Sequence, residues 1–158
     1  MKRYQIIFSS FLALFSFINL TGQVVTNELP PSMEESFPAN FYTQSTITLP
    51  SLDLNAIRKQ DEVEDQIKDI PWRFGIEQKT NTNFLEAGTW VHGKDGMSTC
   101  KLTIKSKDAK SLNLNFNQFK LSANAKLFAY NADYSDVLGA ITIANNTESG
   151  EFAIRPIK

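Results

Sequence analysis

Short runs in which apolar and polar residues alternate fill the chain from Trp72 to its end. In the clearest run, asparagines separate Leu112, Leu114 and Phe116, so all the apolar bulk falls on one face of an extended segment. Similar runs cover residues 97–106, 126–130, 137–143 and 152–154, with turn-forming residues between them. Short strands about 8 to 12 residues apart, without helices between them, predict a mainly β, antiparallel β-sandwich or jelly-roll-like domain over residues 71–158.

A different pattern precedes this domain. Apolar residues recur near helical spacing at Leu54, Ile57, Val63 and Ile67. The side chain of Ser51 or Asp53 can cap the start of a helix by accepting hydrogen bonds from free backbone N–H groups. Pro71 ends it, because the residue before a proline avoids the helical conformation. The apolar stripe is thin, since Asp61 stands where a core-facing helix would hold a hydrophobic residue, so the pattern predicts a short surface helix over residues 51–70.

Residues 1–22 have the composition of a signal peptide. Lys2 and Arg3 precede an apolar run over residues 6–18, which is shorter than the ~20 residues that span a bilayer but suits a signal peptide. Cleavage is expected after Gly22, with Gln23 as the other choice. A single membrane anchor at the N-terminus is the alternative. The pattern predicts export to the extracellular space or the periplasm, without membrane association after cleavage.

Residues 23–50 link the signal peptide to the predicted helix. Prolines at 30, 31 and 38 and the lack of periodicity predict an extended leader or linker over residues 23–40. Residues 41–49 are rich in Thr, Ser and β-branched side chains and end at Pro50, which predicts a strand.

The composition limits partners and cofactors. Lysine and arginine number 16 against 17 acidic residues, a net charge of −1. Removal of Lys2 and Arg3 with the signal peptide leaves 14 against 17, or −3. This balance gives no electrostatic footprint for nucleic acid. One cysteine and one histidine exclude an internal disulfide and any metal site with two cysteine or two histidine ligands. We expect no cofactor, no metal and no nucleic-acid partner.

Residue types that carry catalysis are sparse. His92 is the chain's one imidazole and lies beside the turn at residues 93–96, where a histidine is usually a solvated polar residue. Cys100 alternates in phase with Leu102 and Ile104, which predicts a small buried core residue. No catalytic residue is assigned, so the chain by itself is not expected to be an enzyme.

Acidic side chains gather in the predicted helix at Asp61, Glu62, Glu64 and Asp65. The basic residues of the same segment are Arg58, Lys59 and Lys68. Because opposite charges three or four residues apart pair on a helix surface, we expect a solvated, ion-paired face rather than a pair of catalytic carboxylates.

Trp72, Arg73 and Trp90 are candidates for contact with a ligand or partner. Tryptophan rings can stack on sugars, and they also serve in core or sheet-edge packing. These residues support one interpretation of function, a secreted β-sandwich binding module for carbohydrate or for a cell-surface protein.

An ordered set of short motifs carries a resemblance to a known family. The motifs are Leu49-Pro50 … Leu54 … Asp61 … Ile70-Pro71-Trp72-Arg73-Phe74-Gly75, Gly88-Thr89-Trp90, Ser111-Leu112-Asn113-Leu114-Asn115-Phe116, Ala125-Lys126-Leu127-Phe128-Ala129-Tyr130-Asn131, Val137-Leu138-Gly139-Ala140 with Asn145-Asn146, and Gly150-Glu151-Phe152-Ala153. Over residues 45–158 the chain resembles the amino-terminal prodomain of secreted, trypsin-like bacterial serine proteases of the lysyl-endopeptidase type.

The resemblance implies a β-sandwich prodomain that precedes a chymotrypsin-like catalytic domain. The catalytic domain with its histidine, aspartate and serine has no counterpart here, so no catalytic residue is carried over. The chain therefore matches a fragment of a serine endopeptidase precursor, and its β domain is expected to be truncated at its C-terminus. The implied partner is the protease catalytic domain, in cis in a full-length precursor or in trans. The prodomain would assist folding of the protease or inhibit it, and Lys158 is a candidate for processing by a lysine-specific protease.

A further alternative is that the chain does not fold stably alone, because one edge of its sheet is left unpaired.

Overall fold

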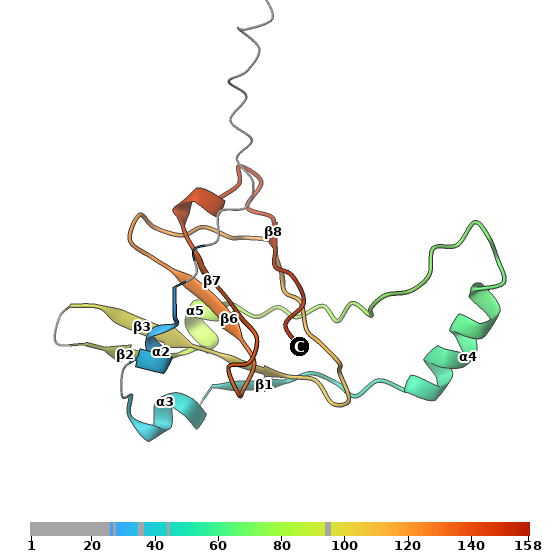
Figure 1. Ribbon diagram of the computed structural model, residues 1–158, viewed down its shortest axis with the longest axis horizontal. Helices are drawn as coiled ribbons and strands as arrows, with labels where there is room; N and C mark the ends of the chain where they lie inside the picture. The colour runs from blue at the N-terminus through green and yellow to red at the C-terminus, as the bar shows by residue number, and fades with distance from the viewer. Residues whose placement is uncertain (1–25, 27, 35–36, 44, 94–95) are drawn as a thin grey trace, which may run out of the picture.

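The computed structural model describes residues 26, 28–34, 37–43, 45–93 and 96–158 (Figure 1). The predicted signal peptide over residues 1–22 lies outside the described residues. The helices are α2 (Pro31–Glu34), α3 (Ala39–Thr43), α4 (Leu54–Glu64), α5 (Phe84–Ala87) and the 3-10 helix η2 (Ile143–Asn145). The strands are β1 (Thr46–Thr48), β2 (Thr89–His92), β3 (Ser98–Lys101), β4 (Thr103–Lys105), β5 (Asn115–Phe116), β6 (Leu127–Tyr130), β7 (Val137–Ile141) and β8 (Phe152–Ala153).

The fold is built of short strands with few helices, as the alternating pattern predicts. In the described part of the chain the strands form four two-stranded sheets. The pairs β2–β3, β5–β8 and β6–β7 are antiparallel. The pair β1–β4 is parallel, which differs from the predicted antiparallel arrangement. Parallel neighbours need a long crossover, and residues 49–102 supply one between these two strands.

The core lies between the β5–β8 and β6–β7 pairs. Phe119, Ile141, Phe152 and Ile154 are buried together, and Leu114 and Phe116 pack against them. The rings of Phe119 and Phe152 stack with their centroids 4.4 Å apart. Burial of one such phenylalanine stabilises the fold by ~1.5–3 kcal/mol. The prediction that Leu114 and Phe116 share an inward face is therefore confirmed.

The segment predicted as an extended leader carries the short helix α2 and the first residues of α3, and it packs on the domain together with the rest of α3. Phe41 is 2% exposed and Pro30 is fully buried. Ser32 shares a 2.9 Å hydrogen bond with the hydroxyl of Tyr130, and the Nζ of Lys101 lies 5.8 Å from the ring centroid of Phe41. Burial of apolar side chains explains why this proline-rich segment is not an extended leader.

The strand predicted over residues 41–49 is shorter, because α3 occupies its first residues. The rings of Phe37 and Phe41 stack with centroids 4.4 Å apart. Phe37 lies two residues before α3, so this contact packs the preceding chain against the helix, and with the burial of Phe41 it favours the helix over the β-branched pattern of the local sequence. Only β1 remains of the predicted strand.

Helix α4 lies away from the sheets (Figure 1) and has no buried residue. Its N-cap is Asp53, whose carboxylate accepts hydrogen bonds from the backbone N–H groups of Asn55 and Ala56 at 3.1 and 3.0 Å. The helix ends at Glu64, earlier than predicted, and residues 65–83 contain no helix or strand. We refer to residues 50–83 as the arm.

Candidate functional site

Arg73 connects the part of the arm that follows α4 to α4 itself. Its Nε lies 3.2 Å from Oδ1 of Asp61, and its Nη2 donates to Oε2 of Glu64 at 3.1 Å. The Asp61 contact is an ion pair without hydrogen-bond geometry. The two carboxylates are three residues apart on α4, so they face the same side of the helix and one guanidinium reaches both.

We call the contacts of Arg73 with Asp61 and Glu64 the Arg73 clamp. They correct the expected pairing of the acidic side chains on α4. Within the described residues, no ion pair joins the α4 carboxylates to the neighbouring basic residues Arg58, Lys59 and Lys68. Arg73 takes that role from outside the helix, because the chain turns back after α4. Its contacts are partly exposed to solvent, so each contributes at most ~1 kcal/mol.

The side chains on either side of Arg73 point into solvent. Trp72 is 78% exposed and Phe74 is fully exposed. Large aromatic side chains of a folded domain usually bury most of their surface, so two neighbouring exposed rings indicate an interaction site. The predicted contact residues Trp72 and Arg73 thus differ in their surroundings: Trp72 is in solvent, and Arg73 is paired with Asp61 and Glu64.

Trp90, the third predicted contact residue, lies elsewhere, on β2. Its indole Nε1 donates to the backbone oxygen of Leu85 at 2.8 Å. Its ring stacks with that of His92, with centroids 6.4 Å apart and planes 11° apart. Among the described residues, no ring contact joins Trp90 to Trp72. The two tryptophans therefore do not form a common stacking platform.

His92 and Cys100 have structural partners. Nδ1 of His92 lies 2.8 Å from the hydroxyl of Ser98 on the neighbouring strand. Cys100 is half-buried, its Sγ lies 3.9 Å from the backbone oxygen of Phe84, and burial raises the pKa of the thiol. A raised pKa keeps the sulfur protonated and poorly nucleophilic at neutral pH. In the part of the chain that the structure describes, no group of three His, Cys, Asp or Glu side chains could hold a metal ion.

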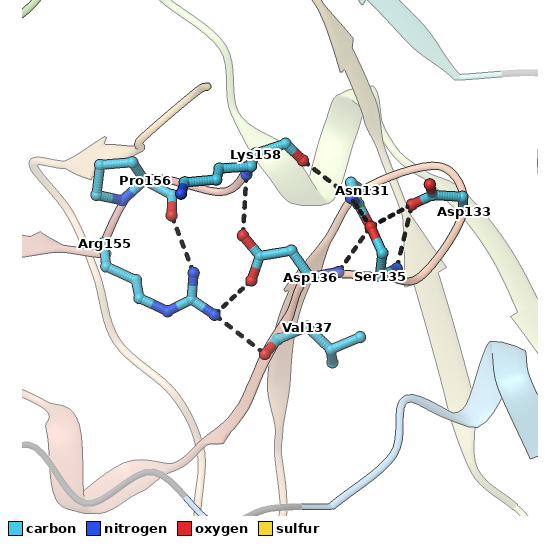
Figure 2. Close-up of polar contacts among 8 residues, drawn as sticks. All are labelled: Asn131, Asp133, Ser135, Asp136, Val137, Arg155, Pro156 and Lys158. Carbon is cyan, nitrogen blue, oxygen red and sulfur yellow. Dashed lines mark hydrogen bonds and ion pairs between the residues drawn. The ribbon is translucent and has the colours of Figure 1, made fainter. Parts of the chain in front are cut away.

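A second polar cluster surrounds the backbone of Lys158, the predicted processing residue (Figure 2). Oδ2 of Asp136 accepts from the backbone N–H of Lys158 at 2.9 Å, and Oδ1 accepts from Nη2 of Arg155 at 2.6 Å. The side-chain amide of Asn131 donates to the Lys158 carbonyl at 2.9 Å. Both main-chain groups of Lys158 are thus hydrogen-bonded, while the residue is exposed.

Asp136 is the centre of this cluster. The hydrogen bond from Arg155, followed by that from the Lys158 backbone, lowers the pKa of the Asp136 carboxyl. The same hydrogen bond raises the pKa of the Arg155 guanidinium. Asp136 gave no signal in the sequence, because its side-chain partners Arg155 and Lys158 lie about twenty residues further along the chain. Asn131 bonds locally to Ser135 and Asp136, and only its bond to Lys158 is distant.

A scan against protein-family models, a search of curated proteins and a search of solved structures each found no match for this chain. Among the described residues, no helix combines the length and the apolar character needed to cross a membrane.

Proposed function

We propose that this chain is the non-catalytic N-terminal prodomain, or a fragment of it, of a secreted lysyl-endopeptidase-like serine protease precursor. In this proposal the signal peptide directs export, and the prodomain assists folding of the protease or inhibits it. The parent precursor would be the endopeptidase. The ordered set of motifs over residues 45–158 supports this assignment.

One structural observation carries the proposal furthest. The arm holds exposed aromatic residues that its own domain does not cover, and Trp72 and Phe74 belong to the first motif of the resemblance. A domain that works by binding another domain needs such a surface. The partner under this proposal is the catalytic domain, in cis or in trans.

The way in which the sheets pack against each other is part of the same proposal. Side chains of the β5–β8 pair and of the β6–β7 pair meet in one core. Two antiparallel layers that share a core are the basic arrangement of a sandwich, so this packing supports an antiparallel β-sandwich or jelly-roll-like prodomain.

The proposal is tested by adding the purified secreted chain to the lysine-specific serine protease of the same cells. We expect a slower cleavage rate of a lysyl substrate, or a higher yield of active protease after refolding from denaturant. Bovine serum albumin at equal concentration is the control for nonspecific protection. An unchanged rate together with an unchanged yield would contradict the proposal.

The DNA downstream of the Lys158 codon provides an independent test. A continuing frame that encodes a Gly-Asp-Ser-Gly stretch is expected for a protease precursor. A stop codon followed by unrelated sequence would favour the binding module instead.

The second candidate function is a secreted binding module for carbohydrate or for a cell-surface protein. Trp90 favours it, because its ring is 42% exposed and lies nearly parallel to that of His92. Such a flat surface can stack on a sugar ring. Titration of tryptophan fluorescence with polysaccharides separates the candidates: a saturable shift that Trp90→Phe abolishes supports the module, and no shift supports the prodomain.

A further inference from the structure

The arm contains an extended segment with one apolar face. Ile70, Trp72, Phe74 and Ile76 occupy every second position, and all four are exposed. In extended backbone, side chains two residues apart point to the same face. Arg73, between them, points to α4 instead. The alternation of Trp72, Phe74 and Ile76 is typical of a β-strand with an exposed apolar face, whereas Ile70 still lies in the turn after α4, where its N–H donates to the backbone oxygen of Ile67.

The backbone of this segment is also unpartnered. Within the described residues, no backbone-to-backbone hydrogen bond involves residues 71–82. This part of the arm leads into α5 as a trace without helix or strand (Figure 1). Free N–H and C=O groups along a strand are a template for pairing with another strand. A lipid surface offers no partners for these groups, whereas the edge of a protein β-sheet does.

The acidic charge around this segment limits the kinds of partner that it can bind. Residues 61–77 contain six acidic and two basic side chains, a net charge of −4. One of the two basic residues, Arg73, is already paired with Asp61 and Glu64. An anionic membrane or a second copy of this chain would bring like charge against the arm. The complementary surface is a protein with basic residues beside its binding groove.

We propose that residues 71–76 bind a partner protein as an added edge strand. The partner has an open β-sheet edge, apolar pockets for alternate side chains and a basic rim. This inference rests on the proposed function, under which the partner is the protease catalytic domain. Arg73 is a positioning residue that holds the segment against α4 with Trp72 and Phe74 facing outward.

The test measures the affinity of the full secreted chain for the lysine-specific protease of the same cells by titration calorimetry. Trp72→Ser and Phe74→Ser should each weaken binding by about tenfold or more, since buried aromatic anchors dominate such interfaces. The matched control is Leu85→Ser, because Leu85 is 60% exposed but lies on α5. The control should bind within about twofold of the wild type, and circular dichroism should show the same fold for all variants.

Hydrogen exchange tests the strand itself. Amides of residues 72–77 should exchange rapidly in the free chain, and alternate amides should slow in the complex because only one edge pairs. Loss of affinity in the variants without slowed amides would overturn the added strand.

The remaining outcomes separate this inference from the proposed function. Tight binding by the wild type that Trp72→Ser and Phe74→Ser leave unchanged would overturn the inference and keep the prodomain function. Absence of any wild-type binding or effect on the protease would overturn the proposed function. Binding to phosphatidylglycerol vesicles, or self-association lost in Trp72→Ser, would show a different occupant and overturn the inference.

Discussion

The guanidinium of Arg73 donates to the carboxylate of Glu64 across 3.1 Å and joins the segment that follows α4 in the arm to α4 itself. The aromatic residues on both sides of this cation, Trp72 and Phe74, remain in solvent. One polar contact on a helix surface therefore orients the most exposed apolar side chains of the described chain. Helix α4 of the arm has no buried residue, so the arm contributes little to the domain core.

Arg73→Ala should free residues 71–76 from α4 without unfolding the domain. We expect the free energy of unfolding in urea to fall by less than ~1 kcal/mol, because partly exposed ion pairs contribute little. Cleavage by chymotrypsin after Trp72 or Phe74 should become faster, since the segment is no longer held against α4. Arg73→Lys, which keeps the charge, is the matched control. A loss above ~2 kcal/mol would show that the clamp supports the core.

Phe152→Ala should destabilise the core strongly. Its ring stacks on Phe119 in the buried cluster, and removal of a buried phenylalanine ring costs ~3–5 kcal/mol. Phe74→Ala is the matched control, because that ring is fully exposed, and it should change stability by less than ~0.5 kcal/mol. Urea denaturation of both variants measures the difference. Similar losses in the two variants would contradict the position of the core.

Asp136→Asn should make the domain less sensitive to acid. The hydrogen bond from Arg155 lowers the pKa of the folded Asp136 carboxyl below its usual value near ~3.9. A lowered folded pKa means that the unfolded chain binds the proton first as the pH falls. The stabilisation is therefore complete above the usual pKa and is lost as the pH falls through the folded pKa.

Melting temperatures measured between about pH 6 and pH 2 test this sign, over a range that spans the usual carboxyl pKa. The wild type should melt higher than Asp136→Asn at the upper end, and the gap should close at the lower end. Asp133→Asn is a comparison that should show a gap of the same sign, because a hydrogen bond from Ser135 lowers the pKa of that carboxyl. A gap that stays constant with pH would refute the contribution of the Asp136 charge.

Gly88→Ala should be destabilising because of Cys100. A Cβ at position 88 would overlap Sγ of Cys100 and would lie 3.0 Å from the backbone oxygen of Phe84. Overpacking of this kind costs ~1–3 kcal/mol. The double variant Gly88→Ala with Cys100→Ala removes the sulfur and should recover part of the loss. Additive losses in the double-mutant cycle would show that the two positions do not collide.

Local patterns predicted the individual strands well where one face is buried. The alternation around Leu114 and Phe116 reflects an inward face, and β6 and β7 fall inside the predicted runs. The capping role of Asp53 was also predictable, because it depends on backbone N–H groups two and three residues away. These features follow from the preferences of neighbouring residues and need no distant partner.

Contacts between distant residues were beyond the reach of these patterns. Burial of Phe41 by later strands gives a helix where the local sequence favours a strand. The Asp136 cluster and the Arg73 clamp depend on where the chain returns. From the sequence, Trp72 and Arg73 are predicted as contact residues on equal terms. Only the tertiary structure separated their roles, because exposure and ion pairing arise when segments far apart in the chain meet.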